Sequence, residues 1–223
     1  MAAPQHFPKK DWDLDFRAEL YKQEFFATHT WSSKRNGLVT AWKSNTTEEL
    51  RELFRLKDDE RPAHIGEIRQ EQQTAVIIGY WYDLLKIGPI SHPQTTELLH
   101  ATIHLAGSVA TYFKARFNRV RPWALAPDLS PPIPLPGLPA YPSGHSAQAY
   151  LMALALADLV PDKQRDDIMG RARTVAINRE RAGLNYPSDT KAGEALAVGV
   201  FEILRECEGF RTTFQEAKET EWN

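Results

Sequence analysis

The chain has 223 residues, 42% hydrophobic and 25% charged, which is enough to bury one sizeable core, and we expect a single domain over residues 1–223. The formal net charge of −2 provides no overall positive field, and no basic patch interleaved with aromatic residues is present, which argues against nucleic acid as a partner. The longest apolar run, residues 149–157, is far shorter than the ~20 residues of a transmembrane helix, so no membrane span is expected.

The N-terminal residues and the cysteine content bear on localisation. Lys9, Lys10, Asp11 and Asp13 stand where an export signal would need its apolar stretch, so no such signal is predicted and a cytoplasmic protein is expected. Cys207 is the only cysteine, which excludes an intrachain disulfide and predicts a buried free thiol.

Helical spacing of apolar residues dominates the chain. A first helix is predicted over about 13–28, and the polar, aromatic-dotted stretch that follows, to residue 45, receives no element. Thr46 and Glu49 fit a capping box at the start of the next helix. From there the predicted helices are 47–57, 63–87, 94–121, 145–159, 161–181 and 188–206.

One long segment cannot be regular. Residues 122–142 contain eight prolines, a density that excludes a helix and a central strand, so an extended loop is predicted. No segment shows the sustained alternation typical of strands. The predicted fold class is therefore all-α, a single helical bundle with a long proline-rich loop crossing one end.

Two cations stand near the end of the predicted helix 94–121. Seven residues make about two helical turns, so Lys114 and Arg121 are predicted to lie on nearly the same face, with Pro122 ending the helix just beyond Arg121. The Lys114 ammonium and the Arg121 guanidinium would then point in the same direction.

A second segment, P-S-G-H, joins the proline-rich loop to an apolar helix. Ser143 is a good N-cap, Gly144 lets a ligand approach the backbone, and free N–H groups at a helix start bind anions. His145 is predicted in the first turn, beside such an anion.

A third segment, residues 178–189, ends one helix near Gly183 and starts another after Pro187, and Arg179 would add a second guanidinium. A lysine, two arginines, a serine hydroxyl and backbone N–H groups make a cradle suited to a tetrahedral dianion such as phosphate. A histidine beside that cradle can protonate a leaving oxygen. The three segments together predict cleavage of a phosphate ester.

In order and spacing these segments resemble the signature of the type 2 phosphatidic acid phosphatase and vanadium-dependent haloperoxidase superfamily. That signature reads K-x6-R-P, then P-S-G-H, then S-R-x5-H-x3-D. The first two parts match in full, whereas the third departs at Asn178, in place of serine, and at Asn185, in place of histidine. The match spans residues 114–189, and the resemblance implies a soluble, bacterial-type member with a helical acid-phosphatase fold.

The resemblance also implies a role for each matching residue. The residues that would bind phosphate or vanadate are Lys114, Arg121, Ser143, Gly144 and Arg179. The catalytic positions would be His145 as acid and base, Asn185 where the family carries its nucleophilic or vanadium-ligating histidine, and Asp189, which would orient residue 185.

Asparagine at position 185 cannot replace that histidine, because its amide nitrogen has no available lone pair. Either the natural protein has given up the covalent mechanism, or a His→Asn change has been introduced here that keeps the shape and removes the nucleophile. The second explanation is slightly favoured, since every other cradle residue except Asn178 is intact.

Three functions follow. The first is hydrolysis of a small phosphate or diphosphate ester without a required cofactor; the second is a haloperoxidase with vanadate as cofactor; the third is an oxyanion-binding protein without turnover. A homo-oligomer is allowed, and the oligomeric state is left open. His100 and His104 have the i,i+4 spacing that can hold a metal, but no third ligand follows at a matching offset, so they are interpreted as structural and no metal ion is assigned.

Overall fold

The computed structural model describes residues 7–8 and 11–222, and within that part of the chain it is helical and contains no strand. The all-α prediction is confirmed. Lys9 and Lys10, used above to argue against an export signal, lie outside the described residues. None of the helices in the described ranges has the length and apolar character needed to cross a bilayer.

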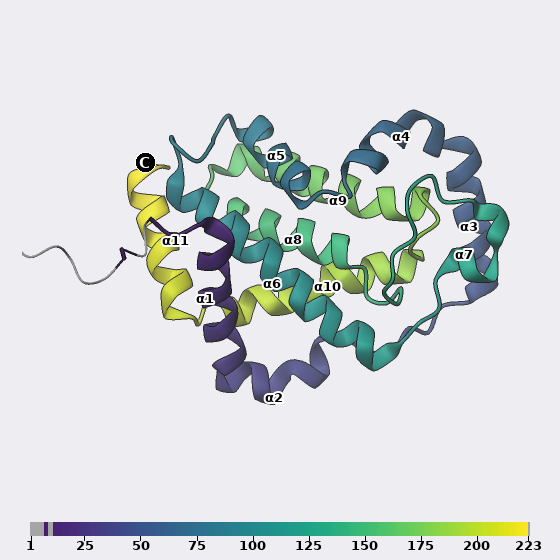
Figure 1. The fold of residues 1–223 in the computed structure, drawn as a ribbon, viewed down its shortest axis with the longest axis horizontal. Coiled ribbons are helices and arrows are strands. Elements are labelled where there is room, and N and C mark those ends of the chain that lie inside the picture. Colours follow the sequence, from purple (N-terminus) through teal and green to yellow (C-terminus); the bar gives the residue numbers. More distant parts are fainter. Residues whose placement is uncertain (1–6, 9–10, 223) are drawn as a thin grey trace, which may run out of the picture.

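Figure 1 shows the helices and the loops that connect them. Their bounds are α1 (Leu14–Ala27), α2 (His29–Leu38), α3 (Thr46–Asp59), α4 (Arg61–Gln70), α5 (Thr74–Leu85), α6 (Pro93–Phe117), α7 (Pro122–Leu125), α8 (Gly144–Ala157), α9 (Arg165–Arg181), α10 (Pro187–Leu204) and α11 (Glu208–Thr220). Two short 3₁₀ turns, Pro127–Leu129 and Asp162–Gln164, precede α8 and α9.

The apolar helix α8 is central and packs against α6, α9 and α10 (Figure 1). Nine of its 14 residues are buried, as expected for a helix that is apolar on nearly all sides. Its alanines let the neighbouring helices approach closely. At one end of the molecule α1 and α11 pack on α6, and at the other end α3, α4 and α7 gather near the proline-rich loop (Figure 1).

The predicted helix 63–87 is two helices, α4 and α5, separated at residues 71–73. The break buries Glu71, whose main-chain and side-chain oxygens accept hydrogen bonds from α8 and α9. The prediction of a capping box at the start of α3 is also wrong, because the N-cap residue is Asn45. The Glu49 carboxylate contacts Ser44, Ser188 and Arg119 instead. Helices α2 and α11 were not predicted.

Helix α6 ends earlier than predicted. Asn118 adopts a left-handed conformation (φ 46°), which asparagine tolerates better than most residues, and the helix stops at Phe117. Arg121 follows in extended backbone as the residue before α7. The prediction that Lys114 and Arg121 share one helical face is therefore wrong, although both side chains reach the same cavity.

The proline-rich loop is confirmed as largely irregular, with only the short α7 and one 3₁₀ turn within it. Apolar side chains anchor it, since Leu129 and Ala140 pack with Tyr186 and residues of α3, and Ile133 packs with Ile68 and Leu184.

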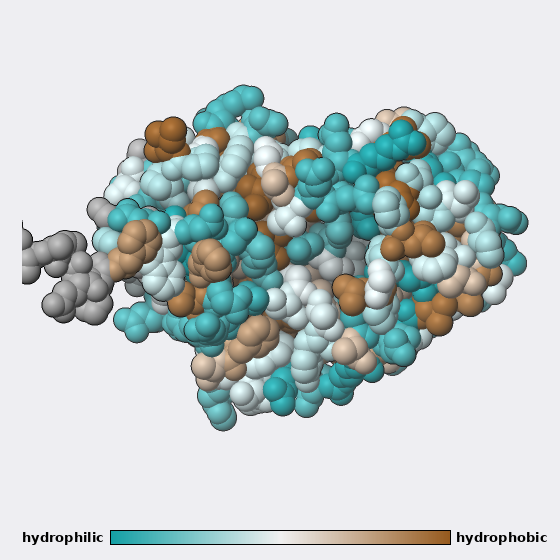
Figure 2. Space-filling model, viewed as in Figure 1, coloured by the Kyte–Doolittle hydropathy of each residue, from teal (hydrophilic) through white to brown (hydrophobic). Residues whose placement is uncertain are grey.

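On the face shown in Figure 2, polar side chains predominate and apolar ones appear in scattered groups.

Candidate active site

The sequence motifs meet around one cavity of about 210 Å³. It lies where the end of α6, the start of α8, the end of α9 and the loop before α10 converge. Six of the predicted site residues line it: Lys114, Arg121, Gly144, His145, Arg179 and Asn185. The other two, Ser143 and Asp189, are fully buried behind that lining.

Lys114 stands in the last turn of α6 and is buried. Its ammonium group donates to the carbonyl oxygens of Pro139 (2.8 Å), Ala140 (2.9 Å) and Pro142 (2.7 Å), which ties the proline-rich loop to the helix. Burial, aided by the positive charge of Arg121, lowers the pKa of Lys114 to about 7. Near neutral pH this lysine is therefore only partly protonated, and a bound anion would favour its charged form.

Arg121 is held by main-chain oxygens. Its Nε donates to the Leu138 carbonyl (2.8 Å), and Nη1 donates to the Leu184 carbonyl (2.8 Å) and to Asn185 Oδ1 (3.1 Å). Burial lowers its pKa to about 10, so the guanidinium stays charged at neutral pH. Arg121 therefore presents a fixed cation at the cavity and also connects two loops.

Arg179 on α9 is different, because Nε and Nη1 are both buried without a hydrogen-bond partner. Burial, and then the charge of Arg121, lowers its pKa to about 10, so this guanidinium also remains charged. Buried donors are nearly always satisfied in folded proteins, and an unpaired charged donor is costly. A missing acceptor in the adjacent cavity would account for both groups.

The start of α8 lies at the cavity. Ser143 Oγ accepts the N–H of Ser146 (3.3 Å) as the N-cap and does not line the cavity, whereas Gly144 does. A Cβ at Gly193 on α10 would lie 2.5 Å from the Ser143 carbonyl oxygen, so only glycine permits this contact between the helices. The close approach holds the positive end of the α8 dipole in place.

His145 is oriented by a distant residue. Its Nε2 lies 3.0 Å from the carbonyl oxygen of Glu71, so Nε2 carries the proton that is donated and Nδ1 remains for another partner. Burial, and then the positive charge of Arg179, hold the pKa of His145 well below its usual range. The free site therefore contains a neutral imidazole.

Hydrogen bonds on three sides fix the Asn185 side chain. Its Nδ2 donates to the Ala140 carbonyl (2.8 Å) and to Asp189 Oδ2 (3.1 Å), and its Oδ1 accepts from Arg121. Both amide hydrogens are thus committed to acceptors. Asp189 Oδ2 also accepts the N–H of Tyr186 (2.9 Å) at the start of α10.

Arg119 is a residue of the site that the sequence interpretation missed. It is buried and bridges two carboxylates, with Nη1 at 2.7 Å from Asp189 Oδ1 and Nη2 at 2.7 Å from Glu49 Oε2. Its guanidinium carbon lies 3.8 Å from the centre of the Tyr186 ring. Burial raises the pKa of Asp189, and the charge of Arg119 opposes that rise. The sequence feature that could have indicated a role for Arg119 is its position between Lys114 and Arg121 in the first motif.

Arg119→Lys tests this bridge. A lysine ammonium cannot span two carboxylates and stack on Tyr186 as the planar guanidinium does, so we expect the free energy of unfolding to fall by about 1–3 kcal/mol. Urea unfolding at neutral pH measures the change, with the exposed Arg211→Lys on α11 as the matched control. Equal stability of both variants would show that the bridge is dispensable.

Asn178, where the family signature has serine, does not line the cavity. Its Nδ2 donates to Glu71 Oε1 (2.9 Å), and its Oδ1 accepts from Arg181 (2.9 Å). Burial raises the pKa of Glu71 to about 7. The asparagine thus supports the segment that orients His145 and leaves the cavity lining unchanged.

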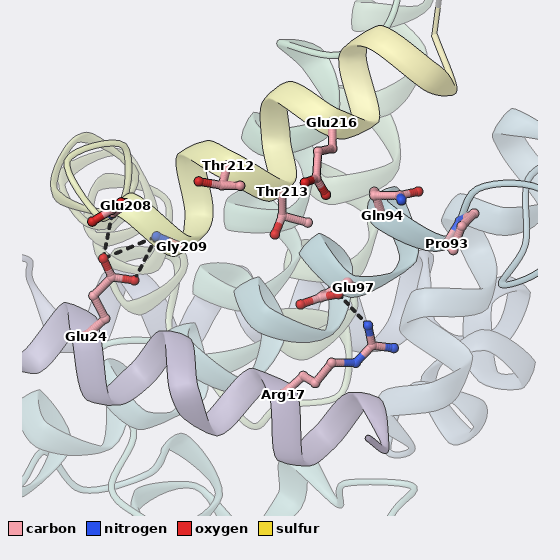
Figure 3. Close-up of a pocket in the computed structure, with 10 residues that line it drawn as sticks. All are labelled: Arg17, Glu24, Pro93, Gln94, Glu97, Glu208, Gly209, Thr212, Thr213 and Glu216. Carbon is pink, nitrogen blue, oxygen red and sulfur yellow. Dashed lines mark hydrogen bonds and ion pairs between the residues drawn. The ribbon is translucent and has the colours of Figure 1, made fainter. Parts of the chain in front are cut away.

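A larger cavity, of about 740 Å³, lies between α1, α6 and α11 (Figure 3). Its charged lining consists of Glu24, Glu97, Glu208, Glu216 and one arginine, Arg17. Arg17 pairs with Glu97, and the Glu24 carboxylate accepts N–H groups at the start of α11. Carboxylates repel an oxyanion, so the smaller cationic cavity is the candidate active site.

His100 and His104 have a neighbour that the sequence interpretation did not find. Asp15, in the first turn of α1, lies against both imidazoles. The sequence could not reveal it, because the aspartate is 85 residues from His100 and the contact depends on how α1 packs on α6.

The structure is a helical protein with a buried cavity lined by Lys114, Arg121 and Arg179. Residues 97–212, more than half of the chain, match the family model of the PAP2 superfamily, and the chain belongs to that superfamily. This confirms the resemblance inferred from the motifs.

Curated relatives include non-specific acid phosphatases. The chain is 30% identical over 132 residues to the one from Providencia stuartii, covering 57% of this chain and 53% of that protein. It is 27% identical over 141 residues to the one from Salmonella typhi, covering 60% and 55%. The chain thus spans about half the length of the curated relatives it matches.

Among solved structures, a transmembrane PAP2-type phosphatidylglycerolphosphate phosphatase from Bacillus subtilis matches with a TM-score of 0.40 and 17% identity. The match covers 86% of this chain and 92% of that one.

Proposed function

We propose that this chain binds the phosphoryl group of a small phosphate or diphosphate ester in the 210 Å³ cavity and hydrolyses the ester. The observation that carries the proposal is Arg179, whose Nε and Nη1 are buried, charged and unpaired beside a cavity that two further cations line. A tetrahedral oxyanion offers the acceptors that these donors lack. The acid phosphatases among the relatives support the same chemistry.

In the proposed complex, Arg121 and Arg179 face the phosphoryl oxygens, and the N–H groups at the start of α8 add the positive end of the helix dipole. Lys114, whose ammonium group is bound to three main-chain carbonyls, adds positive charge beside them. Gly144 leaves room for the anion to approach the backbone. The cavity volume suits a phosphate group with a small leaving group, which is why a small ester is proposed.

His145 is the proposed general acid. Its Nε2 donates to the Glu71 carbonyl, so Nδ1 is the ring nitrogen that can face the leaving oxygen. Burial, and after it the charges of Arg179, Arg121 and Lys114, keep the pKa of His145 low, and a bound dianion offsets those charges. Binding therefore raises the pKa and favours the protonated acid when the ester is present.

Water is the proposed nucleophile: its oxygen bonds to phosphorus as the bond to the leaving oxygen breaks, His145 protonates that leaving oxygen, and the proton of the water passes to the product phosphate. Asn185 Nδ2 has no free lone pair and donates both of its hydrogens, so it neither attacks phosphorus nor supplies a nitrogen ligand to vanadium. The cavity suits the oxygens of vanadate as well as those of phosphate, but because the nitrogen ligand is missing no halide oxidation is proposed. Positioning and charge stabilisation alone support a slow hydrolysis.

The test combines binding with turnover. Calorimetry is expected to show one phosphate bound per chain, and a crystal soaked in phosphate or vanadate is expected to show the anion against Arg121 and Arg179. Slow hydrolysis of an aryl phosphate is expected to fall by about 10²-fold or more in His145→Gln. Binding without turnover above the buffer rate would make this an oxyanion-binding protein, and an anion bound elsewhere would overturn the site.

Anion binding should take up protons. The pKa of Lys114 is about 7 in the free protein, and an anion raises it, so binding above pH 7 requires protonation of the lysine. We expect the Lys114 contribution to the affinity for sulfate, which does not itself titrate here, to be constant below pH 7. Above pH 7 it should fall by up to about tenfold per pH unit for each proton taken up.

Calorimetry in two buffers of different ionisation enthalpy measures this uptake directly. In Lys114→Met the proton uptake by the lysine should vanish, whereas a smaller proton uptake by His145 should remain. A sulfate affinity that does not change between pH 6 and 9 would contradict the predicted coupling.

A further inference from the structure

We propose that Asp15, His100 and His104 form a binding site for a divalent transition-metal ion, best suited to zinc, that joins α1 to α6. Within the described ranges they are the one group of three histidine, cysteine or acidic residues whose ligand atoms all lie close together, within 4.8 Å of one another. None of the three residues lines the candidate active-site cavity. Along α6, His104 precedes Lys114 by ten residues, about 15 Å.

The geometry already brings the ligand atoms together. His100 and His104 stand one helical turn apart on α6, and Asp15 Oδ1 lies 2.9 Å from His100 Nδ1 and 2.9 Å from His104 Nε2. Ligand atoms about 2.0–2.2 Å from a tetrahedral zinc ion are roughly 3.3–3.5 Å apart, so a small outward movement of the carboxylate makes room for the ion.

The donor set and its exposure also fit. Two imidazole nitrogens and one carboxylate oxygen are ligands that zinc accepts, and three protein ligands leave a coordination position for water. The Asp15 side chain is 63% exposed and that of His104 is 37% exposed, so an ion can enter from solvent.

The ion would stabilise the contact between the first helix and the core. Helix α1 packs on α6 through buried residues that include Ala18, Tyr21 and Phe25, and Asp15 lies one turn before them, at the start of α1. A ligand bound only by the folded protein raises its stability. Zinc at about 100 times its dissociation constant would raise the melting temperature by about 5–10 °C.

The experiment titrates zinc into the full chain, after chelation and dialysis, by calorimetry and by thermal unfolding. We expect one zinc ion per chain and a raised melting temperature. Both effects should be lost in His104→Gln and strongly weakened in Asp15→Asn, and both should remain in His29→Gln, which changes an exposed histidine on α2.

Undiminished zinc binding in His104→Gln and Asp15→Asn would place the ion elsewhere and overturn the proposal, as would no binding at a concentration of zinc that saturates ordinary His₂Asp sites. Circular dichroism identifies a variant that fails to fold. If either His104→Gln or Asp15→Asn fails, zinc binding by the remaining variant tests the proposal. Phosphate affinity, measured in parallel, should be equal in all these proteins, so a failure here is distinguishable from a failure of the proposed phosphate site.

Discussion

Asn185→His is expected to raise the rate of aryl phosphate hydrolysis by about 10³-fold or more, because it supplies the nucleophile that the cavity lacks. Histidine Nδ1 and asparagine Nδ2 are both bonded to Cγ, so Nδ1 can take over the hydrogen bond to Asp189 Oδ2. Nε2 then extends further from the backbone. The carbon that replaces Oδ1 accepts no hydrogen bond, which leaves Arg121 Nη1 freer to face the anion.

The control is Asn185→Gln, which keeps an amide and gains no nucleophile, and its rate should stay at the slow level. A phosphohistidine trapped by rapid acid-free quenching in the histidine variant would identify the covalent step. In the double variant with His145→Gln, formation of the phosphohistidine should slow, because the leaving oxygen loses its proton donor.

One result would remove the hydrolase assignment. The histidine variant could keep its fold and its phosphate affinity and gain neither ester hydrolysis nor, with vanadate and peroxide supplied, halide oxidation. The oxyanion-binding function without turnover would then replace the proposed one.

Arg179→Met is expected to weaken phosphate binding by about 3–5 kcal/mol, roughly 10²- to 4×10³-fold, while the free protein loses no hydrogen bond of Nε or Nη1. Those two groups have no partner in the free protein, and methionine keeps much of the apolar volume of the side chain. We therefore expect the unliganded stability to be unchanged or higher. Removing a buried charge with two unpaired donors offsets what is lost in packing and in the attraction to Glu71.

The matched variant is Arg121→Met, in which both the phosphate affinity and the stability of the unliganded protein should fall. Its guanidinium holds the carbonyls of Leu138 and Leu184 as well as facing the cavity, so those oxygens lose their donors. Melting temperatures with and without phosphate measure both effects, and Arg211→Met on α11 controls for the loss of any arginine. If Arg179→Met binds phosphate as tightly as the unchanged protein, Arg179 is structural and the central observation behind the site is lost.

The sequence by itself determined the parts of the site that are close along the chain. Ser143, Gly144 and His145 begin α8 as the N-cap pattern predicts, and Arg179 and Asn185 stand either side of the turn at Gly183, which has a φ of +72°. Helix-end signals act over a few residues, so spacing alone places these groups. The same local rule failed for Lys114 and Arg121, because Asn118 ends α6 between them.

Only the tertiary structure decided which distant residues meet. Arg119 bridges carboxylates 70 residues away on either side, His145 is oriented by a carbonyl 74 residues earlier, and Asp15 reaches His100 across 85 residues. Apolar periodicity predicts which face of a helix is buried and is silent about which helix covers it. The orientation of His145 and the metal-ligand cluster follow from the packing of α4 beside α9 and of α1 on α6, which no local pattern specifies.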